Sequence, residues 1–346
     1  MKKMKKVFAG FLAAAMMLSL SVTAFASESE DEVVDNTSTV TITKIYDATN
    51  TGTTSPEETF AFTIEKGYVN GDDTIYFTDT ASSVTTDNMP IPTIITALTF
   101  AKGAAGSANN TQNITVTLPA YTSVGIYYYT IKETAGSTAG VTYDTDEIVL
   151  KVTVTQEENG SLLPHAVVVS GTNRLKTTDI TNEYSAGALD VKKVVTGNLG
   201  DQSKEFNVTV TFAAPAGKTV KEAISYTEDG ITKTISSDKW TNGTASVVIA
   251  LKHNETITFT NIPYDVTYTV TEADYTSDGY AAAAYTYSDN TNKKIDSDKD
   301  TVTITNTKNG TIDTGISMDS LPYIVALALV LGFAVVMIAR RRRIEE

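Results

Sequence analysis

Apolar and polar residues alternate along most of this chain, a pattern that predicts β-strands. Threonine, valine, isoleucine and tyrosine recur at every second position, and these residues favour extended backbone. The clearest segments are TVTITKIY (39 to 46), NITVTLPAY (113 to 121), EIVLKVTVT (147 to 155), FNVTVTF (206 to 212), TITFTNIPY (256 to 264) and TVTITN (301 to 306). Clusters rich in Gly, Asn, Asp and Ser separate them as turns. Short strands joined by turns predict an all-β fold of antiparallel, immunoglobulin-like sandwiches.

A repeated series of motifs divides this β region into two halves. Each half contains a similar pair of segments and ends in ITN: ITVTLPAY (114 to 121), YTIKE (129 to 133) and ITN (180 to 182), then ITFTNIPY (257 to 264), YTVTE (268 to 272) and ITN (304 to 306). The repetition predicts two tandem sandwiches, residues 38–184 and 188–308, each large enough to bury a core. The first has extra sequence between Gly67 and Asn110, which we expect to be an inserted loop or a small subdomain.

Apolar segments lie on both sides of this β region. Residues 1–26 combine four lysines with an apolar stretch and an AFA ending at Ala26, which predicts a secretory signal peptide. Residues 321–339 form a 19-residue apolar run, long enough to span a bilayer, and four arginines follow at 340–343. Because positive residues stay on the cytoplasmic side, we expect the β region to face outward.

Composition narrows the class of protein. The chain has no cysteine, so its extracellular stability cannot come from disulfides. The net charge of −14 argues against binding nucleic acid or anionic lipid through charge. Residues 27–37 are acidic and predict a disordered tail. His165 and His253 have no zinc-binding spacing, and we expect neither a metal nor a cofactor.

A lysine, a glutamate and an asparagine recur in the same order in both halves. The first set is Lys44, Glu133 and Asn182, and the second is Lys193, Glu272 and Asn306. Each lysine shares the period-two register of the apolar residues around it, so its side chain is expected to face the core. Lys192 falls on the opposite face, and Lys193 is therefore the expected member of the second set.

Burial would push each lysine toward its neutral amine and each glutamate toward its neutral acid. A neutral amine can attack the asparagine carboxamide, while the glutamate polarises the carbonyl and carries protons to the departing ammonia. The product is a Lys–Asn isopeptide bond. A lysine that guards an edge strand, or an ordinary Lys–Glu ion pair, is the alternative for either site taken alone. The recurrence of both sets with the same flanking motifs favours the crosslink.

With these sets, the YTxxE flanks and the two apolar segments, the chain resembles the isopeptide-bonded major pilins of Gram-positive bacteria, in particular the two-domain type. The resemblance implies that Lys44 joins Asn182 and that Lys193 joins Asn306, with Glu133 and Glu272 catalysing each reaction during folding. It covers essentially the whole chain.

The resemblance also gives a meaning to residues 311–346, as a cell-wall sorting signal. TIDTG (311 to 315) stands before the apolar run, where the family carries a sortase motif that is cleaved between threonine and glycine. The cleaved bond would be Thr314–Gly315. Asp313 and the lack of a preceding proline depart from the common motif, which leaves the matching sortase open.

Polymerisation requires a second lysine that accepts Thr314 from another subunit. The common YPK motif of pilins is absent, since no proline precedes a lysine. By resemblance to the two-domain type, the expected acceptor is Lys176 in TNRLKTTD (172 to 179), with Lys66 and Lys151 as weaker alternatives and a solvated loop lysine as the plain alternative.

The expected function is structural: a shaft subunit of a covalently polymerised pilus, held at the Gram-positive cell wall. Its partners would be other copies of itself, sortase, peptidoglycan and, as a further candidate, a host receptor. The only catalysis expected is one intramolecular reaction per domain. The alternative is a monomeric wall-anchored adhesin or stalk that binds a ligand through residues 67–110.

Overall fold

The computed structural model describes residues 38–50, 53–67, 89–170, 179–288, 293–311 and 321–342 of the 346-residue chain. Contacts divide the chain into two compact units. Unit 1 comprises Met1–Ala186 together with Gly217–Glu222, and unit 2 comprises Gly187–Ala216 and Ala223–Glu346. Nearly all of the described residues outside the C-terminal helix lie in strands or their connections, so the all-β prediction is confirmed.

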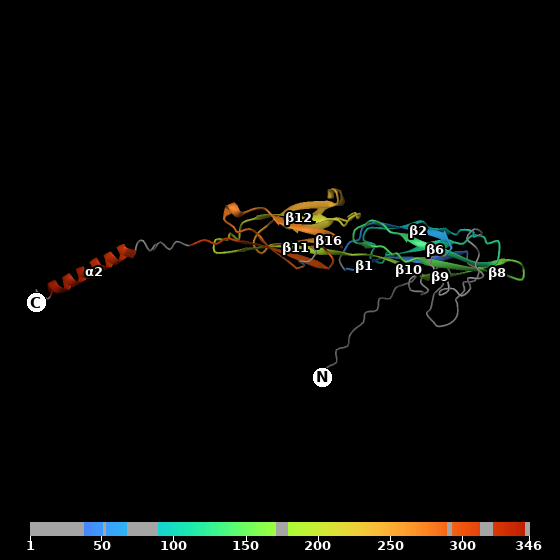
Figure 1. The fold of residues 1–346 in the computed structure, drawn as a ribbon, viewed down its shortest axis with the longest axis horizontal. Helices are drawn as coiled ribbons and strands as arrows, with labels where there is room; N and C mark the ends of the chain where they lie inside the picture. The colour runs from blue at the N-terminus through green and yellow to red at the C-terminus, as the bar shows by residue number, and fades with distance from the viewer. Residues whose placement is uncertain are drawn as a thin grey trace, which may run out of the picture. The chain divides into compact units, whose positions relative to one another are not determined.

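Unit 1 contains two five-stranded sheets (Figure 1). The first has the order β3-β5-β1-β10-β7, with strands Thr93–Ile94, Thr111–Thr117, Thr39–Ala48, Asp179–Tyr184 and Val141–Thr142. The second has the order β4-β2-β6-β8-β9, with strands Ala97–Phe100, Glu58–Lys66, Gly125–Thr134, Ile148–Gln156 and Leu162–Ser170. The first and last strands of the unit, β1 and β10, are parallel neighbours.

The core of unit 1 lies between these sheets and is built by the alternation along the strands. Tyr46 from β1 packs its ring edge-on against Phe60 of β2, with 5.1 Å between ring centroids, and against Phe100 of β4 at 5.8 Å. All three side chains are fully buried. Burial of large aromatic rings is the main favourable term that holds two such sheets together.

The extra sequence of the first domain is only partly described, because residues 68–88 lie outside the described residues. Its described part contributes two short strands to the sandwich. β3 pairs with β5 at the edge of one sheet, and β4 pairs with β2 at the edge of the other. This part of the sequence therefore extends both sheets.

Unit 2 also contains two sheets (Figure 1). The larger has the order β14-β13-β16-β11-β19-β18, with strands Ile231–Ile235, Ile224–Glu228, Thr256–Pro263, Ala186–Thr196, Lys299–Thr307 and Ala284–Tyr287. The smaller has the order β15-β12-β17, with strands Thr244–Leu251, Phe206–Ala213 and Thr267–Glu272. As in unit 1, the first and last long strands, β11 and β19, pair in parallel. Phe212 and Phe259 meet edge-on across the core at 5.4 Å.

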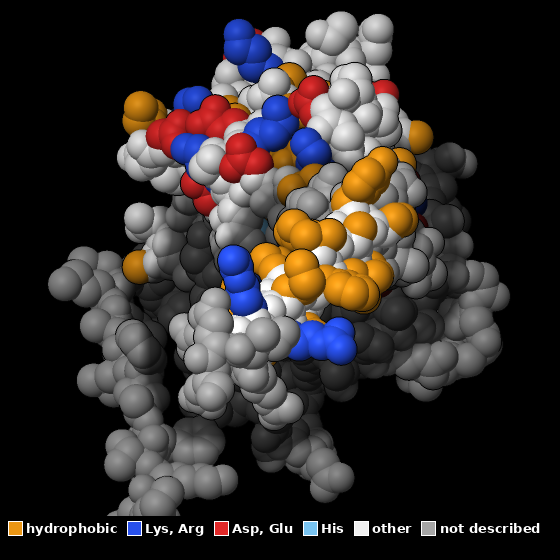
Figure 2. All heavy atoms as spheres, turned by 90° about the vertical axis from the view of Figure 1, so that its left-hand side faces the viewer, with side chains coloured by type: hydrophobic (Ala, Val, Ile, Leu, Met, Phe, Trp, Pro, Cys, Tyr) orange, Lys and Arg blue, Asp and Glu red, His pale blue; other side chains and the backbone are white. Residues whose placement is uncertain are grey.

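The helix α2 covers Leu321–Arg342 and contains the predicted apolar run. Residues Pro322–Arg341 are long and apolar enough to cross a membrane, and none of this segment is buried by the residues that the structure describes. Figure 2 views the chain from the side on which α2 lies and shows hydrophobic side chains exposed over this helix. An apolar helix of this length fits a membrane-spanning segment.

Candidate crosslinking sites

The first site lies where β1 and β10 run side by side. Lys44 of β1 stands opposite Ile180 of β10, and Asn182 follows two residues later. Because side chains alternate along a strand, Asn182 points to the same face as Ile180. Lys44 and Asn182 are both fully buried. The period-two register that predicted an inward lysine therefore also brings the carboxamide to the same side of the sheet.

The glutamate of the first set comes from the opposite sheet. Glu133 lies near the end of β6, and its side chain is 1 % exposed. Its Oε2 lies 2.9 Å from Lys44 Nζ, and its Oε1 accepts a hydrogen bond from Asn182 Nδ2. One carboxyl group thus contacts both nitrogen atoms that would exchange places in an amine-for-ammonia substitution.

Two further contacts complete this site. The backbone N–H of Asp144 donates a 2.8 Å hydrogen bond to Asn182 Oδ1. That donor requires an acceptor, so it fixes which end of the carboxamide is oxygen and directs Nδ2 toward Glu133. Lys44 Nζ lies 4.6 Å from the centre of the Phe60 ring, and the carbonyl oxygen of Ile180 is 3.4 Å away. The amine therefore has an apolar wall on one side and a carboxyl group on the other.

The protonation states follow from this burial. Removal from water lowers the pKa of Lys44, and the nearby Glu133 carboxylate only partly opposes that shift. Removal from water likewise raises the pKa of Glu133, against the opposing effect of Lys44. Both shifts favour a neutral amine beside a neutral acid. A neutral amine is the nucleophile that attack on an amide requires.

The second site has the same strand register. Lys193 of β11 stands opposite Ile304 of β19, and Asn306 follows two residues later. Glu272, the last residue of β17, approaches from the other sheet and places Oε1 2.9 Å from Lys193 Nζ. Lys193 is fully buried, Asn306 is 1 % exposed, and burial lowers the pKa of Lys193.

A phenylalanine again covers the second lysine, since Nζ of Lys193 lies 4.3 Å from the centre of the Phe206 ring. The two sites differ at the carboxamide. Asn306 Oδ1 is buried and has no hydrogen-bond partner among the described residues, whereas Asn182 Oδ1 accepts from Asp144. Lys192 is only partly buried, and the alternation along β11 places it on the opposite face to Lys193.

The structure thus brings together all three members of the first set, and in the second it pairs Lys193 with Glu272 beside the strand that carries Asn306. Three other predicted site residues, Lys176, Thr314 and Gly315, lie outside the described residues, as do the expected signal peptide and acidic tail at 1–37. Of the alternative acceptors, Lys66 is exposed at the end of β2, and Lys151 is partly buried within β8.

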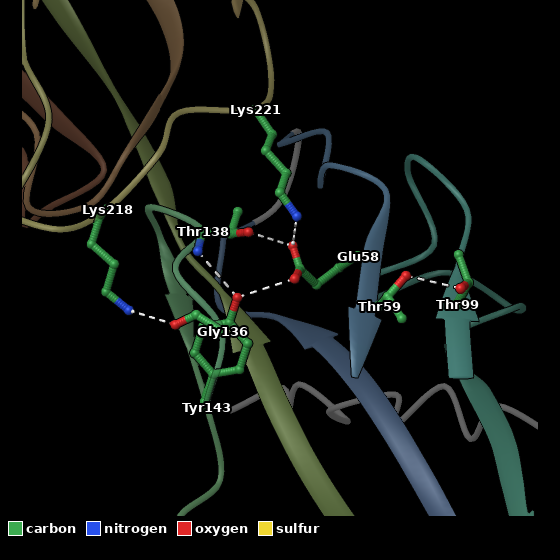
Figure 3. Close-up of polar contacts among 8 residues, drawn as sticks. All are labelled: Glu58, Thr59, Thr99, Gly136, Thr138, Tyr143, Lys218 and Lys221. Atoms are coloured by element: carbon green, nitrogen blue, oxygen red, sulfur yellow. Dashed lines mark hydrogen bonds and ion pairs between the residues drawn. The ribbon is translucent and has the colours of Figure 1, made fainter. Parts of the chain in front are cut away.

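Glu58 is a further buried carboxylate of unit 1 and was not among the predicted site residues. Glu58 is 3 % exposed and accepts hydrogen bonds from Thr138 Oγ1 at 2.6 Å and from Tyr143 OH at 3.1 Å. Lys221 Nζ lies 2.9 Å from its Oε2. Figure 3 shows these donors converging on Glu58. No carboxamide or ester partner is among them, so this cluster is best understood as a satisfied buried charge that holds residues 217–222 within unit 1.

Comparison with known proteins gives matches over both domains. Residues 40–185 match the family described as the Spy0128-like isopeptide containing domain, and residues 187–308 match a domain of unknown function. A pilin of Streptococcus pyogenes serotype M1 is 28 % identical over 94 % of this chain and 98 % of its own length.

Solved structures give similar matches. The crystal structure of the major pilin from Streptococcus pyogenes has a TM-score of 0.54 and 26 % identity, covering 80 % of this chain and all of that one. The major pilin protein T3.2 of the same species has a TM-score of 0.52 at 20 % identity, again over 80 % of this chain and all of that one, which shows a shared fold.

Proposed function

Since the chain is a pilin with a first domain of the Spy0128-like isopeptide containing type, we propose that it is the repeating shaft subunit of a covalently polymerised cell-surface pilus. In this proposal each domain carries one Lys–Asn isopeptide bond. The observation that supports it most strongly is the duplicated site: a buried lysine, a glutamate 2.9 Å away and an asparagine two residues past the lysine's partner on the parallel strand.

The chemistry requires one substitution at each carboxamide. Lys44 Nζ attacks Asn182 Cγ, and Glu133 takes up a proton from the attacking amine and delivers one to Nδ2, which leaves as ammonia. A Cγ–Nδ2 bond is broken, a Cγ–Nζ bond is formed, and the glutamate ends as it began. Lys193, Glu272 and Asn306 do the same in the second domain. The reaction occurs once per domain, so the chain is a structural subunit without turnover.

Crosslinking also removes an electrostatic cost. A lysine and a glutamate that are both out of water lose hydration that their mutual attraction repays only in part. The side chains of Lys44 and Glu133 are 0 % and 1 % exposed, and those of Lys193 and Glu272 have the same values. Once the lysine nitrogen is part of an amide it can no longer take up a proton, so the apolar site no longer has to hold an ionisable amine.

The position of each bond suits a shaft under tension. Asn182 and Lys44 lie on the last and first strands of unit 1, and Asn306 and Lys193 lie on the corresponding strands of unit 2. Tension that enters along one of these strands passes through the bond to the other without loading the intervening fold. The remaining strands are therefore shielded from unfolding by force.

Assembly and anchoring would use the C-terminal segment. We expect sortase to cleave between Thr314 and Gly315, and the apolar helix α2 with its arginines to hold the precursor in the membrane until then. The Thr314 acyl group would pass to a lysine of another copy of the chain and finally to cell-wall peptidoglycan.

A gel of cell-wall extracts tests the polymer directly. Muralytic digestion of the bacterium that makes this chain, followed by denaturing electrophoresis and detection with an antibody to residues 188–308, should give a ladder of covalent multimers. Boiling in detergent should leave the ladder intact because its links are amide bonds. A single wall-linked band would contradict polymerisation and would support the monomeric adhesin instead.

A further inference from the structure

The loop that follows β7 passes directly over the carboxamide of the first site. β7 pairs with the end of β10, where Thr142 stands opposite Glu183. Two residues later, the Asp144 N–H points at Asn182 Oδ1 from 2.8 Å. The loop is held in this position by a local turn, in which the Asp146 N–H donates to Asp144 Oδ1 at 2.8 Å.

The nitrogen and the oxygen of the Asn182 carboxamide contact different polar groups. Glu133 contacts Asn182 Nδ2 with one oxygen and Lys44 Nζ with the other, so its carboxyl group is engaged with the nucleophile and the leaving group. The carbonyl oxygen Oδ1 faces the Asp144 N–H. Negative charge develops on this oxygen when the amine adds to Cγ, and a fixed backbone donor in a dry site stabilises such charge strongly.

We propose that the Asp144 N–H is the oxyanion donor of the crosslinking reaction in the first domain, an inference that rests on the proposed function. When the Nζ–Cγ bond forms, the carbonyl π electrons move to Oδ1, and the Asp144 N–H stabilises the resulting negative charge through its hydrogen bond. When they return, the Cγ–Nδ2 bond breaks, and ammonia leaves with the proton that Glu133 supplies. Atoms and charge balance without a further reactant.

The second site provides an internal comparison. Asn306 Oδ1 has no hydrogen-bond donor among the described residues, although the lysine and glutamate stand at the same 2.9 Å separation as in the first site. A backbone donor therefore distinguishes the two sites, and the Lys193–Asn306 reaction should be indifferent to any change at residue 144.

The test removes the N–H and keeps the side chain. The full chain is made by cell-free translation in detergent, with the α-hydroxy analogue of aspartate at position 144, so that an ester replaces the amide. Samples are quenched over time, and mass spectrometry of proteolytic fragments measures both crosslinked peptides. Formation of the Lys44–Asn182 bond should slow by about 100-fold or more, the usual effect of losing one oxyanion donor. The Lys193–Asn306 bond in the same molecules should form at the unmodified rate.

A matched ester at position 146 serves as the control. It removes the N–H that holds the turn and leaves the Asp144 N–H in place. The control should react within a few-fold of the unmodified chain. Equal slowing by both esters would mean that the loop acts only structurally, and an unchanged rate in the 144 ester would mean that its N–H does not act. Either result overturns the inference.

Folding of the 144 ester is checked by limited proteolysis against Asn182→Ala, which cannot form the bond. Cleavage of the first domain faster than in Asn182→Ala would assign the slowing to misfolding and would also overturn the inference. Failure of the proposed function looks different, because the unmodified chain would then form neither bond.

Discussion

Glu133→Ala should leave Lys44 and Asn182 unjoined and lower the melting temperature of the first domain by roughly 15–20 °C. The bond closes a loop that includes nearly the whole domain, and by analogy with disulfides its loss releases about 5 kcal/mol of restraint on the unfolded chain. For a domain of this size that energy corresponds to the stated shift. The measurement combines calorimetry of the purified variant with its intact mass, which should lie below the mass encoded by the variant's own sequence by one ammonia instead of two.

Two variants separate the bond from the ion pair. Asn182→Ala also prevents the bond but keeps Glu133 beside Lys44, so it should melt above Glu133→Ala, in which the buried lysine loses the carboxylate 2.9 Å from its Nζ. Glu272→Ala should have the corresponding effect on the second domain alone. A Glu133→Ala chain that still lacks two ammonia equivalents would show that this glutamate is not required.

Lys176→Ala should abolish the ladder of multimers in cell-wall extracts and leave a monomer attached to the wall. Without that amine, the acyl group on Thr314 of one subunit has no acceptor on the next. Both intramolecular bonds should form normally, because Lys176 belongs to neither set. Immunoblots of wall extracts from cells that carry the variant measure the ladder, and intact mass confirms the two bonds.

Lys66→Ala and Lys151→Ala are the matched controls for this experiment. Each removes one lysine from unit 1 without touching the crosslinking sites, and each should keep the full ladder. A ladder that survives Lys176→Ala and disappears in one of these variants would move the acceptor to that residue.

Period-two alternation carried most of the information that the sequence held about the fold. It placed Lys44 and Lys193 on the inward faces of their strands, where both are fully buried, and it put Lys192 on the other face. The pairing of first with last strand could not be predicted in this way. It joins residues far apart in the chain, and strand pairing over such distances leaves no local pattern.

Two features of the first domain were missed for different reasons. Glu58 shares the alternation of Phe60 and Phe62, so an inward carboxylate could have been predicted from the pattern that identified Lys44. The Asp144 N–H could not, because every residue except proline has a backbone donor, and only the path of the loop directs this one at Asn182. The side-chain constellation was therefore visible in the sequence, and the backbone part of the site was not.

Each domain is expected to close its own Lys–Asn bond, and the intact mass of residues 27–311 shows whether it does. We expect a mass below that of the encoded sequence by two ammonia equivalents, with fragments that link Lys44 to Asn182 and Lys193 to Asn306. A mass equal to that of the unmodified sequence would mean that neither bond forms.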